Sequence, residues 1–312
     1  ENNIKMFSDN IKINENVLEG CRLNKVMRGI FVLSSCIYPI NPSKFPMDES
    51  MVHESPPHFS NEGYAYAKRM LEMQCRQYNK LGYEFICLTP VNLYGPYDNF
   101  KIKDAHLIPA LMHRFHLHSQ VGKKLVSYGT GKPKRQFLYS LDFAKIILLI
   151  LGNKDIKSGN IICSTDEEYQ IIDVVDKLAD VMKLNKGNIY WDTSKSDGCM
   201  KKTVSNEKLK KIIKDYNFVS LEDGLKETYD WFIKNYDTIK LNNTTNRTKS
   251  EIKWFEDNDD CPTCGQDIES HFKHKEIEKR NDKMIEMSCA LMKMDERLSE
   301  MDAREKLYDN IE

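Results

Sequence analysis

The sequence predicts an α/β fold, a doubly wound parallel sheet, followed by a separate helical segment. In the first 240 residues, short continuous apolar runs alternate with longer amphipathic segments, which is typical of buried parallel strands and their covering helices. Polar residues follow two of these runs, at the strand ends where such sheets carry their chemistry. Beyond residue 265, Glu, Lys, Met and Asp are abundant and strand formers are scarce, so the chain should end in helix.

Each element follows from its own residues. Short apolar runs predict strands at 30–33, 85–88 and 160–163, and the second run is closed by Pro90 and the turn at 94–96. Apolar residues at helical spacing predict covering helices at 61–80, 105–118, 140–152, 170–184, 206–215 and 221–236. The residues that precede the first strand should form one more helix.

The beginning of the sequence lacks a feature that a nucleotide-binding sheet needs. Such a sheet opens with a strand, a glycine-rich turn and a helix whose N-terminus holds a diphosphate. The sequence upstream of residue 30 contains no such turn. We therefore expect an incomplete sheet, with its first βα units missing from this chain.

Bulk composition narrows the class of protein. The 312 residues include 46 basic and 47 acidic side chains, which leaves no net field to attract nucleic acid or an anionic membrane. No apolar run approaches the roughly 18 residues of a membrane span. Nine cysteines, an odd number, without a secretion signal indicate a reducing compartment. We expect a cytoplasmic chain with no membrane partner and no nucleic-acid partner for its α/β part.

Tyr64 and Lys68 give the first chemical signal. Their spacing of four places them on one face of the predicted helix at 61–80. Because a nearby ammonium stabilises phenolate, we predict a pKa for Tyr64 below the ordinary value of about 10. Ser34, at the end of the first strand, can hydrogen-bond the same reacting oxygen. This combination is typical of a carbonyl reductase, in which the tyrosine transfers a proton.

Five motifs occur in the order found in one enzyme family. They are Ser-Ser-Cys-Ile-Tyr-Pro at 34–39, Tyr-Ala-Tyr-Ala-Lys at 64–68, Asn-Leu-Tyr-Gly-Pro at 92–96, His-Leu-Ile-Pro at 106–109 and Lys-Ser-Asp-Gly at 195–198. Over about residues 10–238 the chain resembles the GDP-L-fucose synthases, which are extended short-chain dehydrogenase/reductases. The resemblance implies a Rossmann sheet with a small substrate domain. It also implies NADPH-dependent 3,5-epimerisation and 4-reduction of GDP-4-keto-6-deoxy-D-mannose; another nucleotide-sugar epimerase or reductase is the alternative.

The same resemblance implies a role for each matching residue. Cys36 is the base and His106 the acid of the epimerisation. Tyr64 protonates the reduced oxygen, Lys68 tunes Tyr64 and binds the nicotinamide ribose, and Ser34 stabilises the oxyanion. The residues implied to bind NADPH are Val32, Leu33, Ser34, Ser35, Lys68, Pro90, Val91, Asn92, Leu93 and His106. Those implied to bind the GDP-sugar are Arg114, Tyr128, Arg135 and Asp197. Family members form homodimers, so a homodimer is expected here.

A cysteine pair marks the last part of the chain. Cys261 and Cys264 have the spacing of two thiolate ligands for one zinc ion. Farther on, apolar residues in alternating steps of three and four predict a coiled-coil seam, formed by Met284, Met287, Leu291, Met294, Leu298 and Met301. Residues at about 250–290 resemble the zinc hook of phage recombination endonuclease large subunits and DNA-repair ATPases, in which two chains share one zinc. A metal-free turn between helices is the alternative.

Composition thus divides the chain into three predicted parts. These are an α/β domain at 1–240, a polar linker at 241–250 and a hook-like coiled-coil remnant at 251–312. The joining of an incomplete reductase to a shortened hook suggests a chimeric reading frame. It also leaves a second hypothesis open, a zinc-bridged dimerisation module of a DNA-repair or recombination ATPase that carries the α/β part as a passenger.

Overall fold

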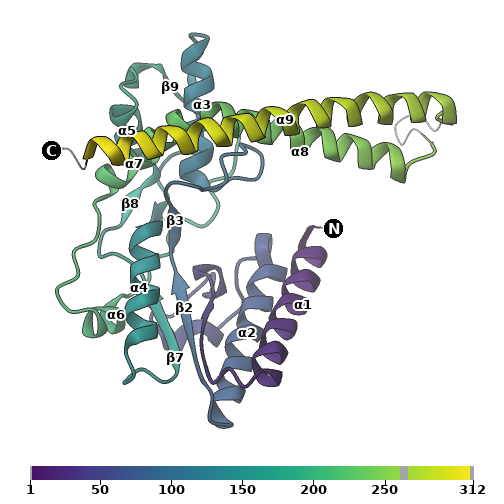
Figure 1. The fold of residues 1–312 in the computed structure, drawn as a ribbon. Helices are drawn as coiled ribbons and strands as arrows, with labels where there is room; N and C mark the ends of the chain where they lie inside the picture. Colours follow the sequence, from purple (N-terminus) through teal and green to yellow (C-terminus); the bar gives the residue numbers. More distant parts are fainter. Residues whose placement is uncertain (1, 261–265, 310–312) are drawn as a thin grey trace. The chain divides into compact units, whose positions relative to one another are not determined.

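The computed structural model describes residues 2–260 and 266–309 and divides into two compact units. The first unit comprises Glu1–Asp230 and the second Trp231–Glu312, and the elements of each are labelled in Figure 1. We describe each unit by itself.

The first unit alternates strands and helices as predicted. Its helices are α1 (Asn2–Leu23), α2 (Glu62–Lys80), α3 (Leu107–Gln120), α4 (Ser140–Gly152), α5 (Ile171–Val181), α6 (Glu207–Ile212) and most of α7 (Leu221–Lys234). Its strands are β1 (Arg28–Val32), β2 (Glu84–Pro90), β3 (Asn92–Tyr94), β4 (Leu125–Tyr128), β5 (Lys134–Arg135), β6 (Phe137–Tyr139), β7 (Gly159–Cys163), β8 (Tyr169–Gln170) and β9 (Ile189–Asp192). Every strand and helix predicted in this unit is present, with ends shifted by a few residues.

The central sheet contains three parallel strands in the order β1-β2-β7. Its register places Ile30 opposite Ile86 on one side of β2 and Leu88 opposite Ile161 on the other. Ile86, Leu88 and Ile161 are completely buried. Figure 1 shows α1 and α2 on one side of this sheet and α4 and α6 on the other. Because both faces are covered, the strands have continuous apolar sequences rather than alternating ones.

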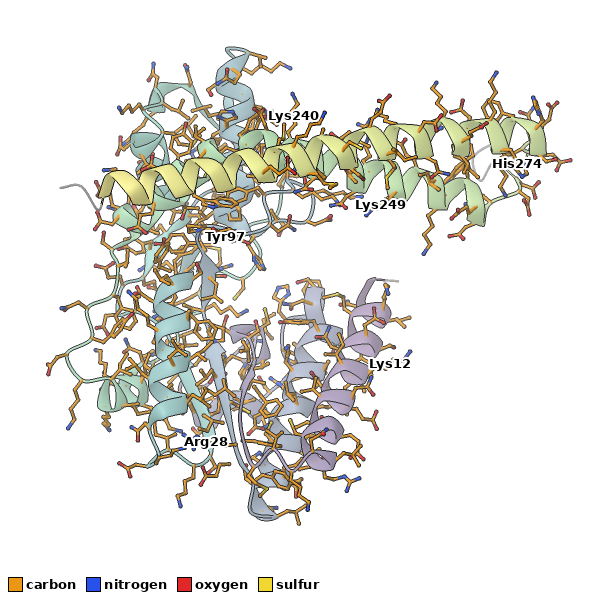
Figure 2. The ribbon with its side chains drawn as sticks, viewed as in Figure 1. Lys12, Arg28, Tyr97, Lys240, Lys249 and His274 are labelled. Atoms are coloured by element: carbon orange, nitrogen blue, oxygen red, sulfur yellow. The ribbon has the colours of Figure 1, made fainter. Side chains whose placement is uncertain are left out.

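Arg28 fixes the amino end of β1 to the end of α4. Its guanidinium donates to backbone oxygens of Ile150, Leu151 and Asn153, and also pairs with Glu84 at 2.7 Å. The last carbonyls of a helix have no partner within the helix and favour a cation. Figure 2 labels Arg28 at this end of the sheet. Arg28 therefore lies at the amino end of the sheet, and the predicted site residues lie at the opposite, carboxyl end.

The other strands of the first unit form small pairs. β3 and β6 are parallel, β4 and β9 are parallel, and β5 and β8 are antiparallel. None of these strands was predicted, because so few residues carry too little periodicity to be recognised. They follow the carboxyl end of β2 along the chain, and two of the predicted GDP-sugar contacts, Tyr128 and Arg135, lie on β4 and β5.

The second unit contains α8 (Tyr236–Asp257) and α9 (Ser270–Asp309), which pack side by side (Figure 1). The predicted linker at 241–250 and the boundary at 240 are wrong, since these residues lie inside α8. Thr245 and Thr248 are buried, and their spacing from Leu241 places all three on one face of the helix. Thr245 Oγ1 donates to the Leu241 carbonyl at 2.9 Å and contacts Met287 Sδ at 3.7 Å. Threonines thus occupy core positions that composition alone assigns to a linker.

The predicted seam on α9 faces its neighbour where its side chains are described. Met287 is buried and Leu291 and Met294 are half-buried, while most residues between them are exposed. Thr238 Oγ1 lies 3.9 Å from Met294 Sδ. The side chains of Leu298 and Met301 lie outside the described residues. Within residues 2–260 and 266–309, none of the helices has the length and hydrophobicity needed to cross a bilayer.

Candidate active site

A cleft of about 640 Å³ opens at the carboxyl ends of β1 and β2. Four of the predicted catalytic residues line it, namely Ser34, Cys36, Tyr64 and His106. All of the predicted NADPH-binding residues except Lys68 line it as well, namely Val32, Leu33, Ser34, Ser35, Pro90, Val91, Asn92, Leu93 and His106. Four residues that were not predicted complete the wall, namely Asn3 and Met6 of α1 and Ser60 and Asn61 just before α2. The cleft therefore lies where parallel sheets usually carry their chemistry.

Ser34 begins the turn that presents the cysteine. It is the N-cap of a short 3₁₀ helix (Ser35–Ile37), and its Oγ accepts a hydrogen bond from the Cys36 amide at 3.2 Å. The extended backbone of Ser34 continues β1, so the turn starts directly at the strand end. The Ser34 hydroxyl also hydrogen-bonds the Tyr64 phenol. Ser34 is thus shared between the cysteine and the tyrosine.

Tyr64 and Lys68 lie on α2, but the ammonium does not act on the phenol as predicted. Lys68 Nζ donates to the Val32 carbonyl at 2.9 Å and lies 5.8 Å from the centre of the Tyr64 ring. Burial, together with the nearby Cys36 sulfur, raises the pKa of Tyr64, and the Ser34 hydrogen bond offsets only part of this effect. Burial likewise lowers the pKa of Lys68. The prediction of a lowered Tyr64 pKa is therefore wrong, because burial raises the pKa and Lys68 does not contribute to lowering it.

Cys36 is half-buried and has a cationic neighbour that the sequence analysis missed. Lys202 Nζ lies 3.4 Å from Cys36 Sγ. Burial alone would raise the pKa of this thiol, but the charge of Lys202 and hydrogen bonds from Ser34, Lys202 and Asn61 outweigh it, so the pKa is lowered. A lowered pKa favours the thiolate, which is the form that can accept a proton.

The position of Lys202 depends on contacts between distant segments. The Met47 amide donates to the Thr203 carbonyl at 2.9 Å, and the Ser205 amide donates to the Met47 carbonyl at 2.7 Å. Gln136, which is buried, accepts from the Val204 amide at 2.8 Å and donates to the Val204 carbonyl at 3.1 Å. These contacts fix the 203–205 segment beside the β1 turn. The only signal in the sequence is a basic residue shortly after the Lys-Ser-Asp-Gly motif.

His106 occupies the N-cap position of α3 and is exposed. Its side chain makes no capping hydrogen bond. Burial raises the pKa of nearby Asp98, and the charge of His106 offsets part of that effect. His106 also lines the cleft, so its imidazole is open to a bound ligand. It therefore suits the acid role that the sequence implied.

The predicted GDP-sugar residues gather at a second cavity of about 260 Å³, here called the Tyr128 cavity. Tyr128, Arg135 and Asp197 line it together with Asn92. Arg114 lies behind the tyrosine, with its guanidinium carbon 4.2 Å from the ring centre. Among the described residues, buried Arg114 Nε has no hydrogen-bond partner. Asn92 also lines the large cleft, so the two cavities share a wall.

Asp197 and Arg135 differ in how free they are. Asp197 accepts from the Thr130 amide at 2.6 Å and from its hydroxyl at 2.8 Å. These bonds lower the pKa of Asp197 and close the turn at 129–131. Burial lowers the pKa of Arg135, whose guanidinium donates only to the Lys134 carbonyl, at 2.7 Å, among the described residues. Arg135 is therefore the more available group for an anionic ligand.

The cysteine pair predicted to bind zinc lies outside the described residues. Cys261 and Cys264 belong to the segment 261–265, so the zinc site stays a prediction. Among residues 2–260 and 266–309, there is no cluster of three or more histidine, cysteine or acidic side chains that could hold a metal ion.

Comparison with known proteins places this chain in a family. Residues 1–163 match the NAD dependent epimerase/dehydratase family. The GDP-L-fucose synthase of Dictyostelium discoideum is 43% identical over 239 residues, which cover 76% of this chain and 74% of that protein. The enzyme of Escherichia coli K12 is 34% identical over 241 residues, or 74% of each chain. A crystal structure of a GDP-L-fucose synthetase from Naegleria fowleri bound to NADP is similar with a TM-score of 0.72 at 38% identity, covering 76% of this chain and 75% of that one.

The fold, the cleft and these matches define an epimerase or dehydrogenase of the nucleotide-binding α/β class. The chain belongs to the NAD dependent epimerase/dehydratase family, and within it to the relatives of the GDP-L-fucose synthases. This confirms the resemblance seen at about residues 10–238. The resemblance of about residues 250–290 to a zinc hook has no such support.

Proposed function

We propose that the first unit carries out the NADPH-dependent 3,5-epimerisation and 4-reduction of GDP-4-keto-6-deoxy-D-mannose to GDP-L-fucose. The observation that carries the proposal is the convergence of Cys36, Tyr64 and His106 on one cleft, from three elements far apart in the sequence. The curated relatives named above are GDP-L-fucose synthases, and the solved relative holds NADP.

The epimerisation needs two proton-transfer groups. Hydrogens on the carbons beside a ketone are acidic, and inversion requires removal of a proton from one face and its return on the other. Cys36, with its lowered pKa, suits the base, and His106 suits the acid. Both side chains line the same cleft, on different elements. This arrangement supports the roles that the family resemblance implies.

The reduction needs a proton donor at the same ketone. NADPH, when bound, supplies the hydride. Tyr64 then donates a proton to the oxygen, and its raised pKa keeps the phenol protonated at neutral pH. The Ser34 hydroxyl can donate to the same oxygen and stabilise its developing charge. A raised pKa is thus compatible with a donor role, although it is opposite in direction to the sequence prediction.

The residues present fit the nicotinamide half of the cofactor. The carboxyl ends of β1 and β2 form a largely apolar wall at 32–33 and 90–93, interrupted by Asn92, beside Tyr64 and the Lys68 ammonium. The described residues contain no glycine-rich strand-turn-helix unit for a diphosphate.

The Tyr128 cavity fits a nucleoside diphosphate. Arg114 is buried and Arg135 is half-buried, and among the described residues neither forms a salt bridge with a carboxylate. Guanidinium groups bind phosphate oxygens in a bidentate manner. Tyr128, which is 51% exposed, offers a ring face for stacking. We therefore assign the GDP moiety to this cavity and the sugar to the adjoining cleft.

Deuterium exchange tests the proposal without relying on NADPH affinity. The chain is incubated in D₂O with GDP-4-keto-6-deoxy-D-mannose, and label at C3 and C5 is followed by NMR. We expect incorporation that Cys36→Ser abolishes, while Cys21→Ser on α1 serves as the matched control. No incorporation by the unmodified chain, or equal incorporation by Cys36→Ser, would refute the proposal. With NADPH added, NMR of the product distinguishes GDP-L-fucose from the product of another nucleotide-sugar reductase.

A further inference from the structure

Lys202 and Cys36 both line a third cavity, of about 210 Å³. The two side chains are half-buried and their terminal atoms are 3.4 Å apart. Lys202 forms no salt bridge with a carboxylate in the described part of the chain, whereas its neighbour Lys134 pairs with Glu168. The cysteine sulfur is thus the group placed to balance the Lys202 charge.

Other charged and titratable groups around Cys36 are less well placed to do this. Tyr64, from α2, is held protonated by its raised pKa and brings no positive charge. Arg135, from β5, interacts with Cys36 only at longer range, and its guanidinium donates to the Lys134 carbonyl instead. His58 lines the cavity, but its Nδ1 accepts from the Ser60 amide at 3.2 Å. Lys202 is the cation in contact with the sulfur.

We propose that Lys202 is a positioning residue that holds the Cys36 sulfur as a thiolate facing the cleft. Its role in turnover rests on the proposed function, since the thiolate is the base of the epimerisation. The interaction itself does not depend on any substrate. An opposite charge within about 4–6 Å commonly favours the charged form of a group by one pKa unit or more.

The backbone segment next to Lys202 is held in place by hydrogen bonds. Backbone bonds to Met47 and side-chain bonds to Gln136 hold residues 203–205 on both sides. Lys202 therefore reaches Cys36 from a fixed backbone rather than from a mobile loop end. The positive charge, rather than the shape of the chain, is the property that the cysteine needs.

Thiol alkylation measures this interaction directly. The purified chain is treated with iodoacetamide over a range of pH, and modification of Cys36 is followed in the tryptic peptide 29–44, which contains no other cysteine. In Lys202→Met we expect alkylation at neutral pH to slow about tenfold and its midpoint to move to higher pH. Lys202→Arg should restore most of the rate. Lys201→Met is the matched control, because Lys201 lies over the Phe45 ring instead.

A second cysteine serves as an internal control for a general loss of structure in the variants. Cys21, on α1, is alkylated in the separate tryptic peptide 13–22, and its rate should be equal in all variants. Slower alkylation of Cys36 alone, restored by arginine, supports the proposal. An unchanged Cys36 profile in Lys202→Met, or an equal change in Lys201→Met, overturns it. These outcomes are independent of turnover, so absence of deuterium exchange would refute the proposed function and leave this inference standing.

Discussion

The two halves of the site are built on different principles. At the strand ends, Ser34, Cys36 and Tyr64 bond to one another and to neighbouring backbone, so their protonation states are set within the protein. At the Tyr128 cavity, Arg135 is half-buried and Arg114, behind the tyrosine, is buried, and neither cation has a carboxylate partner among the described residues. The strand-end residues have their hydrogen-bond partners within the protein, whereas the two arginines are left with positive charge that an anionic ligand could balance. Substitution of the strand-end residues should therefore change reaction rates, and substitution of the arginines should change ligand affinity.

Removal of the Tyr64 hydroxyl should give the largest effect and should divide the two reactions. We expect Tyr64→Phe to lower the rate of NADPH oxidation with substrate by about 10²–10⁴-fold, since it removes the proton donor. Deuterium incorporation at C3 and C5 should persist, because Cys36 and His106 remain. Tyr78→Phe on the same helix is the control. Equal loss of both reactions would contradict separate roles for Tyr64 and Cys36.

Substitution of the cations should weaken binding rather than chemistry. We expect Arg135→Met to lower GDP affinity by about 10–100-fold, the range for a lost hydrogen bond to a charged group. Isothermal titration calorimetry with GDP measures this directly. Lys134→Met is the comparison variant, because it removes a neighbouring positive charge that is already paired with Glu168. It shows whether the loss of any nearby positive charge weakens GDP binding. An Arg135 variant that binds GDP normally would remove this residue from the proposed site.

The pH dependence of the two reactions should distinguish the role of Cys36 from that of Tyr64. The pKa of Cys36 is lowered, so deuterium exchange should rise with pH and level off below the ordinary thiol value of about 8.5. The rate should fall as pH drops through the lowered pKa, because the thiolate is lost. The pKa of Tyr64 is raised, so its donor form should persist above pH 10. Exchange that is unaffected by pH across the thiol range would exclude Cys36 as the base.

The shared wall should give the smallest effect. Asn92 Nδ2 donates to the Gln136 carbonyl at 2.8 Å. Asn92→Ala should lower the free energy of unfolding by about 0.5–1.5 kcal/mol, the usual net value of such a bond. Urea unfolding followed by circular dichroism measures it, with Asn99→Ala on an exposed turn as the control. A loss several times larger would show that Asn92 supports more than this single bond.

The sequence predicted local relationships and missed those made by tertiary structure. The i, i+4 spacing placed Tyr64 and Lys68 correctly on one helix, and apolar runs located the three central strands. The Tyr64 pKa was predicted in the wrong direction, because burial is not visible in spacing. Lys202 was missed because its contact with Cys36 spans 166 residues and depends on bonds to Met47.

The predicted linker at 241–250 is a second case in which burial could not be read from the sequence. Its residues are polar, so composition indicates an irregular segment. Thr245 and Thr248 nevertheless bury their side chains, and the Thr245 hydroxyl bonds to the preceding helical turn. A polar side chain that satisfies its hydrogen bond locally can occupy a core position. The periodicity of threonine was the signal available in the sequence.

Gln136 has a consequence for how the site responds to a ligand. Its amide donates to Val204 and Thr165 carbonyls and accepts from the Val204 amide, so its hydrogen-bonding groups are used. Its own carbonyl receives Asn92 from the cleft wall. The cleft wall at Asn92 and the Lys202 segment are therefore joined through one residue, by its backbone carbonyl and by its saturated side chain. Such a wall is preorganised: a substrate meets it in its final geometry, and little binding energy is spent on ordering it.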